Sequence, residues 1–198
     1  MSSEKKPQFT VLRSVESFKE PRPSIKKRMA DGKALRKVVH FSDQAVYTPP
    51  KDRIDPISIL EAQAKERIES LIPIRYERML QSPFAFFRGG AAIMAQDLAN
   101  QPTTNITVQL CGDMHVSNFG LFGTAEHRLV FGINDFDETL PAPWEWDVKR
   151  LATSFVVAGQ DNQIDTEVAR LVAKACVRSY RENLRKYSKL SPLELWYK

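Results

Sequence analysis

Two apolar runs in the middle of the chain, residues 106–110 and 129–133, each lead directly into a group of acidic and polar residues. The residues that could do chemistry are Asp113, His115 and Asn118 after the first run, and Asp135 and Asp137 after the second. Both runs have strand character, and two antiparallel strands joined by turn residues 120–126 would bring the two groups together. The resulting pocket would offer carboxylate and amide oxygens to a hard cation, and one carboxylate for proton transfer.

Phosphoryl transfer needs such a set of side chains. One carboxylate orients the attacking hydroxyl, an amide and a second carboxylate hold Mg²⁺, and a cationic donor lies near the transferred phosphate. Arg88, beside Gly89 and Gly90, is the candidate for that donor, and its alternative role is a structural ion pair. The alternative interpretation of Asp113 and Asp135 is that they form turns at strand ends.

The spacing of these residues resembles the active site of protein-kinase-like phosphotransferases. An Asp is followed five positions later by an Asn, and a short strand then leads into Asp-Phe. A His two residues after the first Asp is closer to the aminoglycoside and choline kinase branch than to protein kinases, which carry Lys there. The resemblance implies Mg²⁺ and ATP as cofactors, and a nucleotide and a small-molecule acceptor as partners.

The same resemblance implies a role for each residue. Asp113 is the expected catalytic base or hydroxyl orienter, and His115 is a phosphate or carboxylate partner, its alternative being a structural histidine. Asn118 and Asp135 are the expected metal ligands, with Asn118 also at the cofactor. Asp137 shares a strand face with Asp135 and is a further metal candidate. A sixth residue, Asp147, matches an Asp that braces the catalytic loop, although a helix N-cap is an equally good reading.

Three longer blocks, residues 82–89, 109–115 and 134–151, resemble the bacterial domain-of-unknown-function family 2252. That family is grouped with kinase-like folds, and the resemblance runs from about Gly32 to the C-terminus. The chain departs from kinases in several respects. It has no glycine-rich phosphate loop of the usual spacing, and no clear strand-borne Lys with a helical Glu partner. Cys111 also stands where many kinases have His.

Helices are expected on both sides of the strands. Helical patterns or caps predict them from Asp55 to Pro73 and over residues 75–80, 91–99, 147–159 and from 165 onward. Helices, then strands, then helices indicate an α+β fold rather than a doubly wound sheet. As a kinase-like fold it would be incomplete, with N-terminal lobe elements, the catalytic-loop hairpin and the following helices, and a C-terminal truncation.

Composition limits the class of protein. The 198 residues are 42% hydrophobic, which is enough for a core, and no apolar run approaches the ~20 residues that cross a bilayer. The N-terminus lacks the apolar stretch of a secretory signal, so a cytoplasmic location is expected. The two cysteines lie far apart, which argues against a disulfide framework or a zinc site.

The positive charge is concentrated near the N-terminus. Residues 1–40 hold eleven Lys or Arg against four Asp or Glu, with no helical or strand period. We expect a disordered basic arm over residues 1–31, able to make weak contact with polyanions, and a kinase-like domain over residues 32–198.

Three functions remain open from the sequence. The first is a Mg²⁺-dependent, ATP-using phosphotransferase with a small-molecule acceptor. The second is a metal-dependent hydrolase that uses the aspartates of both groups and His115. The third is an inactive, truncated binding domain.

Overall fold

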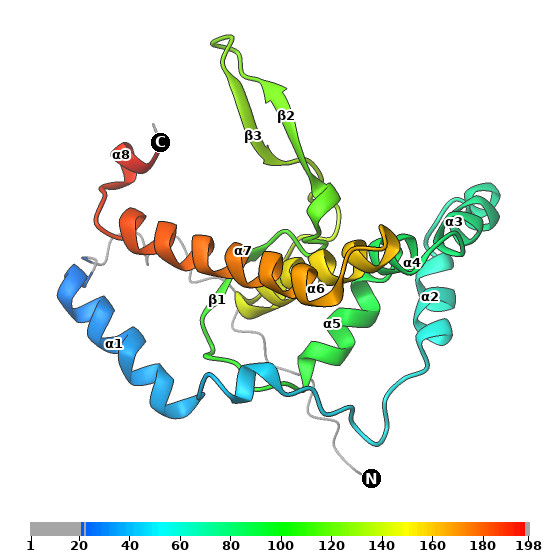
Figure 1. The fold of residues 1–198 in the computed structure, drawn as a ribbon, viewed down its shortest axis with the longest axis horizontal. Coiled ribbons are helices and arrows are strands. Elements are labelled where there is room, and N and C mark those ends of the chain that lie inside the picture. Colours follow the sequence, from blue (N-terminus) through cyan, green and yellow to red (C-terminus); the bar gives the residue numbers. More distant parts are fainter. Residues whose placement is uncertain (1–20, 22, 197–198) are drawn as a thin grey trace.

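The computed structural model describes residue 21 and residues 23–196 (Figure 1). Its first half consists of helices and short 3₁₀ turns: α1 (Ile25–Val38), η2 (Asp43–Ala45), α2 (Pro56–Ala64), η3 (Glu69–Leu71), α3 (Ile72–Met79), α4 (Pro83–Gly89) and α5 (Ala91–Ala99). The centre contains the strands and one 3₁₀ turn: β1 (Thr107–Leu110), η4 (Val116–Asn118), β2 (Phe119–Gly123), β3 (Leu129–Ile133) and β4 (Leu140–Pro143). The last elements are α6 (Glu145–Asp161), α7 (Thr166–Tyr187) and α8 (Pro192–Trp196). This order confirms the α+β expectation.

The strands form two separate antiparallel pairs. β1 pairs with β4, and β2 pairs with β3 in a hairpin that extends away from the helices (Figure 1). The predicted pairing of residues 106–110 with 129–133 is therefore wrong. Gly120 and Gly123, which fall within the predicted turn, lie in β2. The turn itself is closed by a hydrogen bond from the Thr124 N–H to the Arg128 carbonyl.

β4 was not predicted because two of its four residues are prolines. Pro141 and Pro143 lack the N–H that a strand interior normally donates, and both lie opposite β1 in a sheet that has only two strands. Each strand of such a sheet has an open edge, and proline is tolerated there. The apolar pair Leu110 and Leu140 ends this ladder.

The core consists of two small apolar clusters on either side of α5. One is formed by Leu98, Leu110, Ala142 and Trp146, and the other by Leu60, Met79 and Ile93. α7 packs along α6, as Figure 1 shows. The contact is close because Gly159 has no side chain, and an added Cβ there would lie 2.8 Å from the Cβ of Ala169.

Most predicted helices are present, with one correction. The helix after Asp55 begins as expected, with the Asp55 carboxylate accepting the Ser58 N–H at 2.9 Å. It ends at Ala64 rather than at Pro73. Pro73 instead lies in the first turn of α3, where a missing N–H costs no hydrogen bond.

The basic N-terminal segment differs in part from the expected irregular arm. Residues 1–20 and 22 lie outside the described residues, whereas residues 25–31 belong to α1, so the expected boundary at 31 falls inside a helix. The Ser24 side chain accepts the Lys27 N–H, and no side chain of α1 is buried. This helix is stabilised by its N-cap and by the helix propensity of its residues, and not by burial. It therefore lacks the apolar residues at helical spacing that a buried face would show.

Within the described part of the chain, no helix combines the length and apolar composition that a bilayer requires. α7 is the longest helix at 22 residues, and it carries many charged side chains. Cys111 is buried and Cys176 is partly buried, and both are free thiols.

Candidate active site

One face of α6 holds the loop that runs from residue 111 to residue 118. The α6 side chains that contact this loop are three and four residues apart, so they project from one face of the helix; they are Asp147, Arg150 and Ser154. The Asp147 carboxylate accepts the N–H of Cys111 at 2.8 Å and the N–H of Gly112 at 3.1 Å. Asp147 therefore braces the loop and is not the N-cap of α6, a position that Trp144 occupies.

Ser154 holds the far end of the same loop. Its hydroxyl is fully buried, accepts the Val116 N–H at 3.0 Å and donates to the Leu151 carbonyl at 2.7 Å. Both ends of the loop are thus hydrogen-bonded to one rigid helix.

Arg150 is the buried centre of the site, with 3% of its surface exposed. Its Nε donates to Asp113 Oδ1 at 2.8 Å, and its Nη2 donates to the same oxygen and to the Phe87 carbonyl, the latter at 2.7 Å. The guanidinium also lies 4.3 Å from the centroid of the Phe87 ring. A buried charge must be paired, and Arg150 meets this need by joining α4, α6 and the loop.

Asp113 lies between Arg150 and His115. Its Oδ2 is 3.4 Å from Nε2 of His115, whose ring is buried and packs edge-on against Phe84. Burial alone would raise the pKa of Asp113, but the hydrogen bond to His115 and the charge of Arg150 outweigh it and lower this pKa below its usual range. The carboxylate is therefore ionised at neutral pH.

Asn118 ties the two predicted groups of residues together. Its buried side-chain Nδ2 donates to the carbonyls of Asp113 and Asp135 at 3.1 and 3.0 Å, and its Oδ1 accepts the Asp135 N–H at 2.9 Å. The segments that carry Asp113 and Asp135 thus lie together although their strands do not pair with each other. One lone pair of the amide oxygen already serves this bridge.

Asp135 and Asp137 form an exposed turn. Asp135 Oδ1 accepts the Asp137 N–H at 2.9 Å, and both residues are exposed. Across the described residues, no three His, Cys, Asp or Glu side chains are grouped closely enough to hold a metal ion by themselves.

Arg88 is separate from this network. It is exposed in the last turn of α4, and its side chain makes no hydrogen bond or ion pair with any other described residue. Arg88 therefore has no ion-pair partner in the described part of the chain, as its alternative structural role would require.

Gly112 is required by the shape of the loop. Its φ is +88°, and a Cβ added there would lie 1.8 Å from the carbonyl oxygen of Glu138. This close approach explains why the loop needs a residue without a side chain at this position.

The thiol beside Asp147 is inert. Burial and the charge of Asp147 raise the pKa of Cys111 to about 11. Its Sγ donates to the Asp135 carbonyl at 3.2 Å. A neutral, hydrogen-bonded thiol is a structural group and not a nucleophile.

Sequence reasoning missed Arg150 and Ser154, which hold the loop, and Glu145, a buried residue at the start of α6. Arg150 and Ser154 could have been found with Asp147, because polar residues at this spacing beside an apolar stripe indicate a polar contact face. Glu145 carried no local signal. This buried side chain accepts the N–H and the hydroxyl of Thr104, both at 2.7 Å, from a position 41 residues away.

The arrangement brings a fixed, ionised carboxylate together with a turn that carries two exposed carboxylates. Asp113 is an ionised carboxylate held in place by Arg150, and 24% of its side chain is exposed. The nearby turn adds the carboxylates of Asp135 and Asp137, which are exposed. Oxygen donors of this kind suit Mg²⁺.

Comparison with known proteins gives a family. No curated protein and no solved structure matches the chain. A family model described as an uncharacterized protein conserved in bacteria, DUF2252, matches residues 67–198, which are two thirds of the chain. The matched region includes every candidate site residue from Arg88 to Asp137 as well as the α6 face that holds the loop. The chain therefore belongs to the DUF2252 family.

Proposed function

We propose that this chain is a Mg²⁺-dependent, ATP-using phosphotransferase of the protein-kinase-like class, with a small molecule as acceptor. One observation carries the proposal: α6 and Asn118 hold an ionised Asp113 at a fixed place beside the turn that presents Asp135. This combination of a fixed carboxylate and a neighbouring cation-binding turn is what phosphoryl transfer requires.

Asp113 suits the task of orienting the acceptor hydroxyl. Its pKa lies below the usual range, which makes it a weak base but keeps its charge. Phosphoryl transfer passes through a loose transition state in which position and charge matter more than base strength. His115, two residues later, supports a small-molecule acceptor because that spacing resembles the aminoglycoside and choline kinase branch.

The donor set fits Mg²⁺ when the nucleotide supplies part of the coordination. Mg²⁺ is usually bound by one or two carboxylates together with water and substrate phosphates, rather than by a full protein cage. Asp135 and Asp137 offer exposed carboxylate oxygens, and Asn118 Oδ1 accepts the backbone N–H of Asp135. When bound, the cation would neutralise the charge that develops on the transferred phosphate.

Arg88 is the available cation for the phosphates. Arg150 is already committed to Asp113, whereas Arg88 is exposed and has no partner among the described residues. The described residues before β1 form helices and turns without a strand. The proposal therefore rests on the loop, the turn and α6, and not on a phosphate-covering lobe.

Nucleotide binding is tested by the melting temperature. ATP with Mg²⁺ at 100 times its dissociation constant should stabilise the protein by about 2.7 kcal/mol, a shift of roughly 5–10 °C for a chain of this size. ATP without Mg²⁺ should give a smaller shift. The control Asp52→Asn, which changes an exposed carboxylate outside the site, should keep the full shift.

Two further variants separate the roles of the carboxylates. Asp135→Asn should reduce the Mg²⁺-dependent shift, because an amide lacks the charge that a hard cation prefers. Asp113→Asn should keep the shift but lower phosphate transfer or slow ATP hydrolysis by roughly 10²–10⁴-fold. Equal loss of nucleotide binding in both variants would favour the metal-dependent hydrolase. Wild-type behaviour in both variants would mean that Asp113 and Asp135 only form turns.

A further inference from the structure

A stripe of basic side chains runs along α7, outside the site described above. Its members are Arg170, Lys174, Arg178, Arg181 and Arg185. Because successive helical residues turn by about 100°, these five positions fall within about 80° of the helix circumference. We call them the α7 basic stripe.

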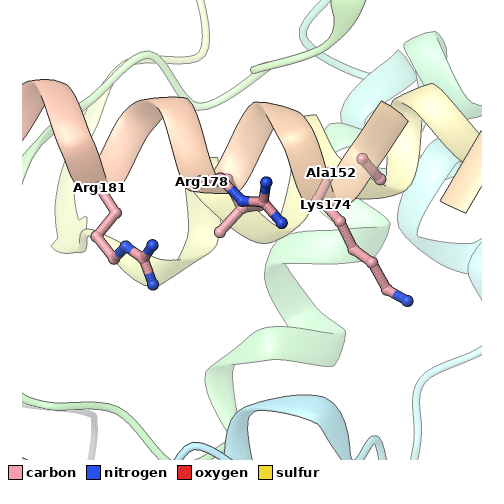
Figure 2. Close-up of a pocket in the computed structure, with 6 residues that line it drawn as sticks. Ala152, Lys174, Arg178 and Arg181 are labelled. Atoms are coloured by element: carbon pink, nitrogen blue, oxygen red, sulfur yellow. The ribbon is translucent and has the colours of Figure 1, made fainter. Parts of the chain in front are cut away.

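The stripe is exposed and is centred about 120° around the helix from the face that packs against α6. α7 packs against α6 through Ala169 and Ala173, which are buried, and Tyr180 stacks on Trp144 with the ring centroids 6.1 Å apart. All five stripe residues are exposed. Figure 2 shows Lys174, Arg178 and Arg181 leaving the helix in a row on one side.

Most of the positive charge in the stripe is unpaired within the described chain. Arg170 is paired with Glu167 at 2.6 Å, and Arg181 makes one loose contact of 3.9 Å with its exposed neighbour Glu182. Lys174 and Arg178 have no acidic partner among the described residues. Concentrated, unpaired charge of one sign attracts a ligand of the opposite sign.

A shallow groove of about 400 Å³ accompanies the stripe (Figure 2). Its apolar lining comes from Ala152, Ala173 and Val177, and its basic lining from three members of the stripe: Lys174, Arg178 and Arg181. The cations therefore border a hollow that can receive a ridge of a partner, and do not stand alone on a convex surface.

We propose that the α7 basic stripe binds the phosphate backbone of a double-stranded nucleic acid without reading its sequence. From Lys174 to Arg185 the cations recur every ~4.5–6 Å over about 16 Å of helix. A duplex presents one negative charge per ~1.7 Å of its axis, so each cation meets phosphates along this length. This inference is independent of the phosphotransferase proposal.

The side chains of the stripe favour contact with phosphates over stacking on bases or hydrogen bonding to base edges. Single-strand binders stack bases on aromatic side chains, and sequence-specific binders use residues such as Asn and Gln against base edges. The stripe has neither kind of side chain. Arginine, which fills four of its five positions, matches phosphate geometry with its planar fork.

The test measures binding of a fluorescein-labelled 20-base-pair duplex by fluorescence anisotropy between 50 and 200 mM salt. The triple variant Lys174→Gln, Arg178→Gln, Arg181→Gln removes the cations that line the groove. Each lost phosphate contact should reduce the slope of log K against log salt by about 0.9, hence by about 2.7 in total. Affinity at low salt should fall with it.

Lys186→Gln is the matched control. Lys186 lies on α7 but about 120° from the centre of the stripe, so its loss should leave the salt slope unchanged. The control also isolates the stripe from the charge of α1, which every variant retains. If the triple variant no longer melts cooperatively, the exposed single substitution Arg178→Gln carries the same test with a slope change of about 0.9.

Three results would overturn the proposal. The triple variant could keep the wild-type salt slope, or Lys186→Gln could reduce the slope as much as a stripe substitution does. Unlabelled polyglutamate could displace the duplex as effectively as unlabelled duplex of equal charge, which would assign the stripe to an acidic protein surface instead.

Discussion

Asp113 keeps its charge in a partly buried position because two basic side chains flank it. The guanidinium of Arg150 and the ring of His115 offset the burial that would otherwise favour the neutral acid. The folded protein therefore holds the ionised form more strongly than the unfolded chain does. This difference links the stability of the fold to pH.

The pH prediction concerns acid conditions. Since the folded pKa of Asp113 lies below its usual value of 3.8, its contribution is present above that value and is lost as the pH falls through the folded pKa. We expect Asp113→Asn to be less stable than the wild type at pH 7 and to lose less stability between pH 4 and pH 2.5. Thermal melts across this range measure the effect. Parallel profiles for variant and wild type would contradict it, and Asp52→Asn should follow the wild type.

The surroundings of Gly112 leave no room for a side chain. Gly112→Ala would place a Cβ against the Glu138 carbonyl and strain a backbone with φ of +88°. We expect a loss of at least roughly 1–3 kcal/mol in urea unfolding. Gly123→Ala, where no heavy atom lies within 4 Å of the added Cβ, should change stability by less than about 0.5 kcal/mol. Equal effects would refute the steric explanation.

At the scale of elements, α6 both packs the core and holds the site. Trp146 contributes to an apolar cluster, while Asp147, Arg150 and Ser154 fix the loop. The same helix also reaches α4, because Asp161 accepts hydrogen bonds from Ser82 and from the Phe84 N–H. A disturbance of α6 therefore reaches the core and the site together.

Ser154 and Thr153 are neighbours in α6, but Ser154 is buried against the loop whereas Thr153 is exposed. Ser154→Ala should cost about 1–3 kcal/mol, because it leaves the partly buried Val116 N–H without its acceptor. Thr153→Ala changes a neighbouring exposed residue that bonds only to its own helix, and should cost less than about 0.5 kcal/mol. Chemical denaturation of both variants checks the difference. A similar cost for the two would mean that the loop contact adds nothing to stability.

At the scale of the whole molecule, the two strand pairs differ in how far they pack against the core. β1 and β4 contribute Leu110 and Ala142 to the core, at 2% and 0% exposure. β2 and β3 project from the body and expose Leu121, Leu129 and Phe131. An isolated two-stranded hairpin is marginally stable in water.

Hydrogen exchange should report this difference. We expect the amides of residues 119–123 and 129–133 to exchange faster than the hydrogen-bonded amides of β1 and β4, although both pairs have two strands. Mass spectrometry of deuterium uptake would resolve the two regions. Equal protection would show that the hairpin has support beyond the contacts described here.

Local pattern predicted the elements that depend on local interactions. Asp55 and Asp165 cap helices as expected, and residues 129–133 form a strand with the expected bounds. The two groups of site residues also lie together. The predictions failed where distant contacts decide the structure: the prolines of β4 concealed the partner of β1, and no local signal joins Thr104 to Glu145.

The base of the β2–β3 hairpin is joined to the site, so a movement of the hairpin would also move site residues. β2 begins at the residue after Asn118, β3 ends two residues before Asp135, and the Asn134 N–H donates to the Asn118 carbonyl at 3.0 Å across its base. A five-residue strand is about 16 Å long and its neighbour is about 5 Å away, so a sideways shift of ~3 Å at the tip tilts the base by ~1 Å. A displacement of that size at a reacting group can cost roughly 100-fold in rate. A partner that contacts the exposed apolar side chains Leu121 and Leu129 of the hairpin would therefore act on the segments that carry Asp113 and Asp135 without touching either residue.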